Sequence, residues 1–96
     1  MSPRDELAFR RAEILRLSRL HGATNVRVFG SFARDAARAE SDLDLLVDVG
    51  PRPSAFFPGG LVADLEELLG RPVDVLTEGA IHPLLRARIL AEAVPL

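Results

Sequence analysis

The feature that most constrains this chain is the spacing between a Gly30-Ser31 pair and two aspartates, Asp42 and Asp44, which reads G-S-x10-D-x-D. The alternating, β-branched residues 26–29 predict a strand, and the residues after Gly30 predict a short helix from Ser31. A strand that turns into a helix at a glycine presents unpaired backbone N–H groups and the positive end of a helix dipole. We therefore expect Gly30 and Ser31 to bind a phosphate group.

Asp42 and Asp44 open a second predicted strand, residues 42–49. Side chains alternate between the two faces of a strand, so both carboxylates project from one face. The opposite face is apolar and is expected to meet a core through Leu43, Leu45, Val47 and Val49. Two ionised carboxylates repel each other, and their oxygens are good ligands for hard divalent cations such as Mg²⁺. Two such ions would bridge the carboxylates and the phosphates of a nucleotide.

Each of these motifs is commonplace alone, but together they resemble a known family. The segments GSFAR at 30–34 and SDLDLLV at 41–47 resemble the minimal nucleotidyltransferases of the DNA polymerase beta superfamily. These are small proteins encoded beside HEPN-domain toxins as their antitoxin partners. The resemblance extends to residues 68–76 and to a closing helix at 83–93. It implies an α/β (α+β) fold in which a small mixed β-sheet is flanked by helices.

The family resemblance also implies a third catalytic carboxylate, at Asp74. Val73 and Val75 flank it and would be buried, so the Asp74 side chain would leave the opposite face of a short strand, towards Asp42 and Asp44. We expect Asp74 to orient or accept the proton of the attacking hydroxyl. The expected catalytic and Mg²⁺-binding residues are therefore Asp42, Asp44 and Asp74. The expected nucleotide-binding residues are Gly30, Ser31 and Arg34.

The implied reaction is the transfer of AMP from ATP to a protein hydroxyl. The acceptor would be a tyrosine of a cognate HEPN ribonuclease toxin, which is thereby neutralised. Two alternatives stay open: a catalytically weak antitoxin that acts by stoichiometric binding, and transfer to a small molecule, which the lack of a second domain disfavours. Many members of the family have glycine where this chain has Asp35, and an extra carboxylate there would oppose nucleotide binding.

Composition limits the other possibilities. A length of 96 residues predicts a single domain, residues 1–96. The formal net charge is -2, and no long basic stripe with interleaved aromatic residues occurs, so we expect no direct nucleic-acid binding. Cysteine is absent, which excludes disulfides and thiol chemistry. No apolar stretch approaches the ~18 residues of a membrane span, so the protein is expected to be cytoplasmic and away from membranes.

The remaining elements follow from periodicity and from breaker residues. The order expected is a helix at 5–20, a strand at 25–29, the short helix from 31, the strand at 42–49, an irregular loop at 50–60, a helix at 61–69, a strand at 73–76 and a helix at 83–93. The tail at 94–96 is expected to add an edge strand or to contact a partner. Phe29 is expected in the core. Phe56 and Phe57 are expected to pack under the loop, with stacking on an adenine or contact with a partner as the alternative.

Overall fold

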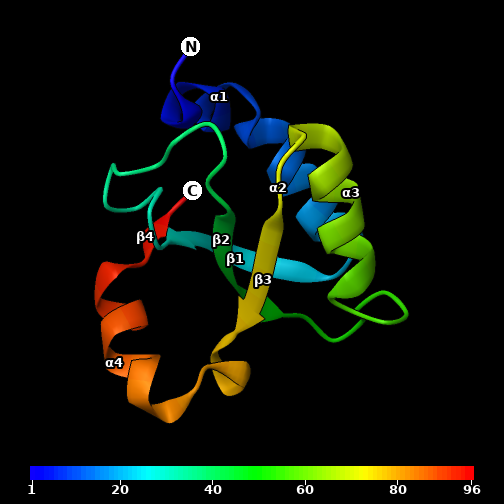
Figure 1. The fold of residues 1–96 in the computed structure, drawn as a ribbon. Coiled ribbons are helices and arrows are strands. Elements are labelled where there is room, and N and C mark those ends of the chain that lie inside the picture. Colours follow the sequence, from blue (N-terminus) through cyan, green and yellow to red (C-terminus); the bar gives the residue numbers. More distant parts are fainter.

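The computed structural model describes residues 1–96 and consists of a four-stranded sheet with helices packed around it (Figure 1). The mixed sheet flanked by helices confirms the predicted fold class. The elements in chain order are α1 (Pro3–Phe9), α2 (Arg11–Leu20), β1 (Ala23–Phe29), β2 (Leu43–Val49), α3 (Gly59–Leu69), β3 (Val73–Thr77), a short 3₁₀ helix η1 (Glu78–Ala80), α4 (Pro83–Glu92) and β4 (Val94–Pro95).

The strand order in the sheet is β3-β2-β1-β4. β1 runs antiparallel to both β2 and β4, whereas β2 and β3 are parallel. The helix α3 makes the crossover between the two parallel strands. The predicted edge strand at the chain end is therefore confirmed, and it lies beside β1.

Apolar residues from both faces of the sheet form two clusters. On one face, Ile14 of α2 and Leu61 and Leu65 of α3 pack against alternate residues of β2 and β3. On the other face, Phe29 and Leu46 pack with Ile81 and Ile89, so η1 and α4 cover this side. Leu43, Leu45 and Val47 are fully buried, as predicted, but Val49 is 44% exposed because it ends β2, where the chain enters the loop at 50–58.

The predicted helix at 5–20 is instead two helices, which meet at Arg10. The Arg10 backbone has φ −94° and ψ 4°, outside the helical region, and its side chain pairs with Glu13 at 2.9 Å. α1 begins earlier than expected because Ser2 caps it reciprocally with Asp5. No glycine or proline stands at Arg10, so the sequence carried no signal for the break.

The predicted short helix from Ser31 is also absent, and residues 31–35 form hydrogen-bonded turns. The N–H of Arg34 donates to the carbonyl of Gly30 at 3.1 Å, and the N–H of Ala36 donates to that of Ser31 at 2.8 Å. Asp35, where many members of the family have glycine, has φ 57°, in the left-handed region. A residue in that conformation cannot continue a right-handed helix, so the segment stops after one turn.

The aromatic residues divide between core and surface. Phe29 is buried, and Phe57 packs against the core as predicted, whereas Phe56 is 94% exposed at φ 59°. The prediction for Phe56 was therefore wrong, because the backbone there turns its side chain outwards. No helix in the structure has both the length and the apolar character needed to cross a membrane.

Truncating a buried side chain of β2 tests the packing of the sheet. We expect Leu45→Ala to lower the free energy of unfolding by about 2 to 5 kcal/mol, since it leaves a cavity at a fully buried position. Urea unfolding followed by circular dichroism measures this loss. Leu84→Ala is the control, because Leu84 is 86% exposed, and a change within ~0.5 kcal/mol is expected. Equal losses for both variants would contradict the assigned core.

Candidate active site

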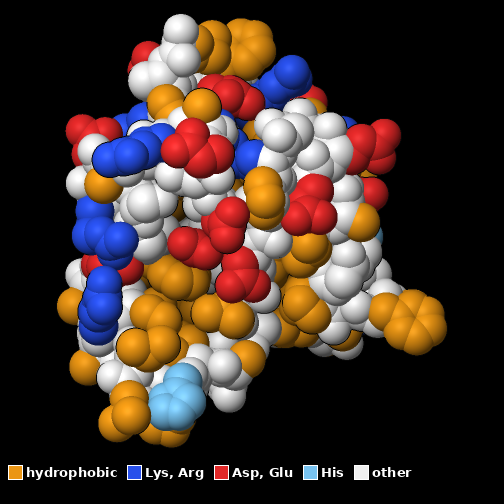
Figure 2. Space-filling view, in the orientation of Figure 1, with side chains coloured by type: hydrophobic (Ala, Val, Ile, Leu, Met, Phe, Trp, Pro, Cys, Tyr) orange, Lys and Arg blue, Asp and Glu red, His pale blue; other side chains and the backbone are white.

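The parallel pairing of β2 and β3 brings two of the predicted aspartates together. Asp44 and Asp74 are register partners on these adjacent strands, whose backbones lie about 4.8 Å apart. Asp42 immediately precedes β2 and is exposed. Figure 2 shows a group of acidic side chains on the face that carries β2 and β3. The structure therefore places all three predicted carboxylates in one region, Asp42 and Asp44 as the strand pattern indicated and Asp74 as the family resemblance implied.

The carboxyl group of Asp44 is the most perturbed of the three. Its pKa is raised from 3.8 to about 6, first because burial removes solvent from the charged form and then because Asp74 and Asp42 repel that charge. Glu92 adds to the repulsion, whereas the positive charge of Arg34 acts in the opposite direction. A half-buried carboxylate surrounded by like charges is a position at which a cation would be stabilised.

Gly30 lies directly against Asp44. Its backbone has φ 72°, and a Cβ atom at this position would clash with Oδ2 of Asp44. Glycine is needed here on both grounds, since other residues rarely adopt this conformation and any side chain would displace the carboxylate. The turn that follows β1 is consequently held close to the aspartates on β2.

The turn after Gly30 carries unused hydrogen-bond donors. The backbone N–H groups of Ser31, Phe32 and Ala33 donate to no acceptor within the protein, and the hydroxyl of Ser31 has no partner either. The unpaired donors predicted from the sequence are therefore present at residues 31–33, although no helix supports them. Successive unpaired N–H groups in a turn form a concave site suited to an anion.

The N–H of Gly30 itself has a partner that the sequence analysis missed. It donates to Oε1 of Glu92, the last residue of α4, at 2.8 Å. The same carboxylate pairs with Arg34 Nη1 at 3.1 and 3.2 Å, and the Gly30 hydrogen bond is the main reason that the pKa of Glu92 lies below its usual range. Arg34, predicted to bind nucleotide, is thus tied to Glu92 while its side chain stays 47% exposed.

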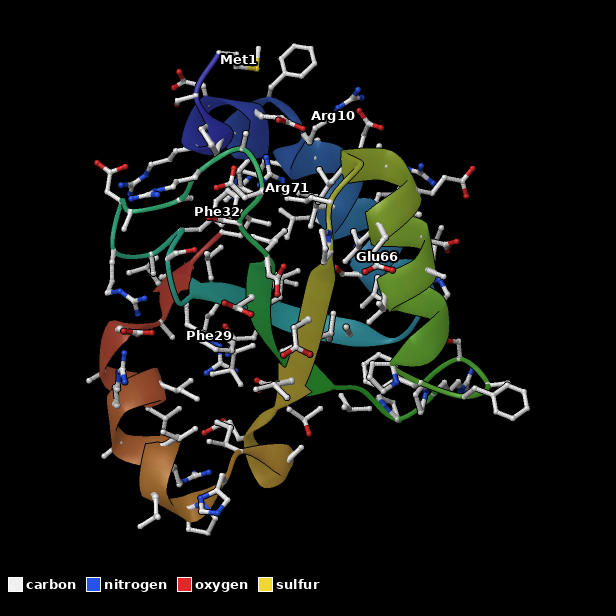
Figure 3. The ribbon with its side chains drawn as sticks, in the orientation of Figure 1. Met1, Arg10, Phe29, Phe32, Glu66 and Arg71 are labelled. Carbon is white, nitrogen blue, oxygen red and sulfur yellow. The ribbon has the colours of Figure 1, made fainter.

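Arg71 is a second residue whose role the sequence did not reveal. Its side chain is only 8% exposed and donates from Nη1 to the carbonyl of Ser41 at 2.9 Å. Its guanidinium also lies over the ring of Phe32, 5.1 Å from the centroid (Figure 3). Arg71 therefore links the donor-rich turn, through Phe32, to the residue that precedes Asp42.

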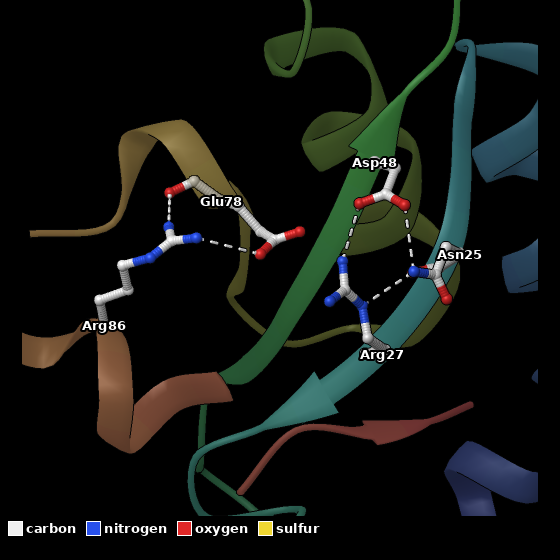
Figure 4. A network of polar contacts seen from close by, with 5 residues as sticks. All are labelled: Asn25, Arg27, Asp48, Glu78 and Arg86. Carbon is white, nitrogen blue, oxygen red and sulfur yellow. Dashed lines mark hydrogen bonds and ion pairs between the residues drawn. The ribbon is translucent and has the colours of Figure 1, made fainter. Parts of the chain in front are cut away.

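Asp48 lies outside this group, four residues along the chain from Asp44 on β2. Its carboxylate accepts hydrogen bonds from Arg27 at 2.9 Å and from Asn25 at 3.0 Å (Figure 4). Arg27 reaches Asp48 because a bulge between Thr24 and Arg27 shifts the register of β1 against β2. Asp48 thus has its own cation, in contrast to Asp44.

The donor chemistry of the three aspartates fits a hard divalent cation. Carboxylate oxygens are the ligands that Mg²⁺ and Mn²⁺ prefer. After burial, the second cause of the raised pKa of Asp44 is repulsion by Asp74 and Asp42, which a cation between them would relieve. As the side chains stand, no three acidic or histidine groups are close enough to hold one metal ion together. Asp42, Asp44 and Asp74 remain the residues available for such an ion.

Comparison with known proteins identifies the family. Residues 13–96 match the family described as the nucleotidyltransferase domain. The chain belongs to this family. A Methanocaldococcus jannaschii protein provisionally named a protein adenylyltransferase is 49% identical over 74 residues, which cover 77% of this chain and 80% of that protein. Protein adenylyltransferase MntA of Thermococcus cleftensis is 36% identical over 73 residues, which cover 76% of this chain and 74% of that protein.

Solved structures agree on the fold of this nucleotidyltransferase. A structure described provisionally as a minimal nucleotidyltransferase has a TM-score of 0.85 and 45% identity, covering 100% of this chain and 97% of that chain. A toxin–antitoxin crystal structure with AMP-PNP has a TM-score of 0.73 at 19% identity, covering 88% of this chain and 69% of that chain, a likeness of fold alone. The predicted family and its fold are therefore confirmed.

The raised pKa of Asp44 predicts a pH-dependent stability. The folded-state pKa exceeds the unfolded value, so this contribution to stability is complete below pH ~3.8 and is lost as the pH rises through about 6. In the presence of EDTA, we expect Asp44→Asn to be more stable than the wild type above pH 6, by on the order of 1 to 2 kcal/mol after solvent screening. Thermal unfolding between pH 4 and 8 measures the difference, which should vanish near pH 4. Curves of stability against pH that run parallel for the two proteins would contradict the raised pKa of Asp44.

Proposed function

We propose that this nucleotidyltransferase transfers AMP from ATP to a hydroxyl group of a partner protein, acting in the cytoplasm as a single domain. The resemblance to minimal nucleotidyltransferases points to a tyrosine of a HEPN-domain ribonuclease toxin as the acceptor, and adenylylation would neutralise that toxin. The relatives named as protein adenylyltransferases support the reaction type. The toxin–antitoxin complex of the same fold, which contains AMP-PNP, is consistent with a toxin partner and with ATP as the substrate.

The proposal depends above all on the approach of a donor-rich turn to a group of carboxylates. Gly30 packs against Asp44, and Asp44 is the register partner of Asp74. The next three N–H groups after Gly30 have no acceptor within the protein. A triphosphate held by the turn would therefore have its phosphates beside the aspartates, which is the arrangement that nucleotidyl transfer requires.

Each group of the chain has a proposed task. Gly30 lets a phosphate approach the turn closely, and the backbone N–H and hydroxyl of Ser31 donate to its oxygens, while the guanidinium of Arg34 adds a positive charge beside them. Asp74 orients the acceptor hydroxyl and accepts its proton as the oxygen attacks the α-phosphorus, with pyrophosphate as the leaving group. The products are the AMP-modified hydroxyl and pyrophosphate.

Asp42, Asp44 and Asp74 are also proposed to hold Mg²⁺, with two ions as the expected number. When bound, Mg²⁺ supplies positive charge to the phosphate oxygens, which stabilises the transition state of the transfer. The carboxylates provide the oxygen ligands, and the burial of Asp44 strengthens their electrostatic interaction with a cation.

Substitution of the aspartates tests the reaction. The purified protein is incubated with Mg²⁺, ATP labelled at the α-phosphate, and a candidate HEPN-domain toxin from the same genome. We expect the wild type to label the partner protein. The labelling rate should fall by about 100-fold or more for Asp44→Asn, since a carboxylate beside the reacting phosphate is removed. Asp48→Asn is the matched control, because Asp48 lies on the same strand but pairs with Arg27.

The outcomes of this experiment separate the competing functions. Neutralisation of the partner without any label would replace the proposal with stoichiometric binding. Label on a small molecule rather than on the partner would indicate a different acceptor. Equal activity of Asp44→Asn and the wild type would remove the aspartates from the mechanism.

The metal requirement can be tested on the same reaction. We expect EDTA to abolish labelling and an excess of Mg²⁺ or Mn²⁺ to restore it in the wild type, because both ions favour carboxylate ligands. Asp42→Asn should need a higher Mg²⁺ concentration for half-maximal labelling, since one ligand is lost. A titration of the rate against Mg²⁺ measures both effects. Full labelling in EDTA would contradict a carboxylate-bound metal.

A further inference from the structure

We propose that Glu92 is a positioning residue that holds the phosphate-binding turn and the guanidinium of Arg34 in place for the nucleotide. This inference rests on the proposed function, because it assigns the support of that same site. The Glu92 carboxylate accepts a hydrogen bond from the N–H of Gly30 and pairs with Arg34, so one side chain contacts both ends of the turn. Glu92 itself touches no substrate in this assignment.

The register of the terminal strand explains how Glu92 reaches the turn. Val94 pairs with Val28 and Pro95 pairs with Arg27 in the antiparallel ladder between β4 and β1. Continuing this register by two residues places Glu92 opposite Gly30. Two further hydrogen bonds fix the chain end, one from the N–H of Leu96 to the carbonyl of Val26 at 3.0 Å and one from Arg11 to the carbonyl of Leu96 at 2.9 Å.

The turn needs this support because no regular element continues from it. Residues 31–35 form turns rather than a helix, and Asp35 ends them in the left-handed region. Backbone hydrogen bonds within the turn therefore fix its shape only locally. The Glu92 carboxylate, whose side chain is 19% exposed, connects it to α4, which packs through Ile89 against Phe29 and Leu46 of the sheet.

Glu92 does not occupy the hydrogen-bond donors that a phosphate needs. It uses the N–H of Gly30 and one nitrogen of Arg34, Nη1, whereas the N–H groups of residues 31–33 and the other guanidinium nitrogens of Arg34 stay unpaired. A residue that merely occupied the phosphate site would consume those donors as well. The arrangement thus favours support of the turn over competition with the nucleotide, and the two roles predict opposite changes in affinity.

Nucleotide binding distinguishes these roles. The probe is α,β-methylene ATP, which cannot transfer its AMP, in the presence of MgCl₂. Calorimetry measures its Kd. We expect Glu92→Ala to raise the Kd by roughly tenfold or more, since it removes a charge-assisted contact that fixes the turn. Glu92→Gln keeps an acceptor for Gly30 but loses the charge that pairs with Arg34, so an intermediate rise is expected. Glu78→Ala is the control, because it removes a different glutamate–arginine ion pair, that with Arg86 at 3.4 Å, and no contact of the turn.

Two readouts separate positioning from general destabilisation. Exchange of the Gly30 amide hydrogen, followed by NMR, should be slow in the wild type and faster in Glu92→Ala, while amides of β2 stay protected. In the labelling reaction, the KM for ATP should rise by about the same factor as the Kd while kcat changes little, because the turn binds the triphosphate equally before and during transfer.

Other results would overturn the inference. Tighter nucleotide binding by Glu92→Ala would mark Glu92 as a competitor, and unchanged binding with unchanged Gly30 exchange would mark it as inert. A fall in affinity of the same size in Glu78→Ala would reduce the effect to general stability. Failure of the wild type itself to bind the nucleotide would defeat the proposed function and this inference with it, whereas normal wild-type binding with an inert Glu92 defeats the inference alone.

Discussion

Carboxylates on adjacent strands repel one another, and this protein holds two of them side by side by burying the strands that carry them. Asp44 and Asp74 stay register partners because Leu43, Leu45 and Val75 on the opposite face pack against α2 and α3. The register of the two strands is fixed, since a shift of one residue would turn the apolar side chains of a strand from the core to the opposite face. The energy of the core thus maintains an electrostatic arrangement that would be unfavourable in isolation.

The turn after β1 complements this acidic region with groups of the opposite polarity. Gly30 approaches Asp44 so closely that no side chain fits between them. The backbone donors of residues 31–33 and the cation of Arg34 then stand beside the aspartates without neutralising them fully. Donors and carboxylates side by side suit a ligand that is itself a complex of phosphate and divalent metal, which neither group would bind as well alone.

Local patterns in the sequence were sufficient to predict most of the strands and the faces from which the aspartates project. Alternation along each strand predicts which face Asp44 and Asp74 leave, whereas the expectation that the two lie together came from the family resemblance. The break at Arg10 could not be predicted, because good helix formers surround it and no glycine or proline marks it. The helix expected after Ser31 is absent because Asp35 adopts a left-handed backbone conformation. Glu92 and Arg71 were missed for another reason: their partners lie 62 and 30 residues away in the chain, at distances no local pattern encodes.

The sheet order gives Asp74 an additional significance. β3 is an edge strand, and only β2 pairs with it, so its outer backbone groups face away from the sheet. Exposed edges invite the strands of neighbouring molecules to add on, and a charge on the edge opposes such aggregation. Asp74 is exposed on this strand, so we expect its charge to oppose pairing of a second molecule along the edge. Replacing Asp74 with a neutral residue would remove this opposition, so the colloidal behaviour of such a variant has to be checked before its lost activity is assigned to chemistry.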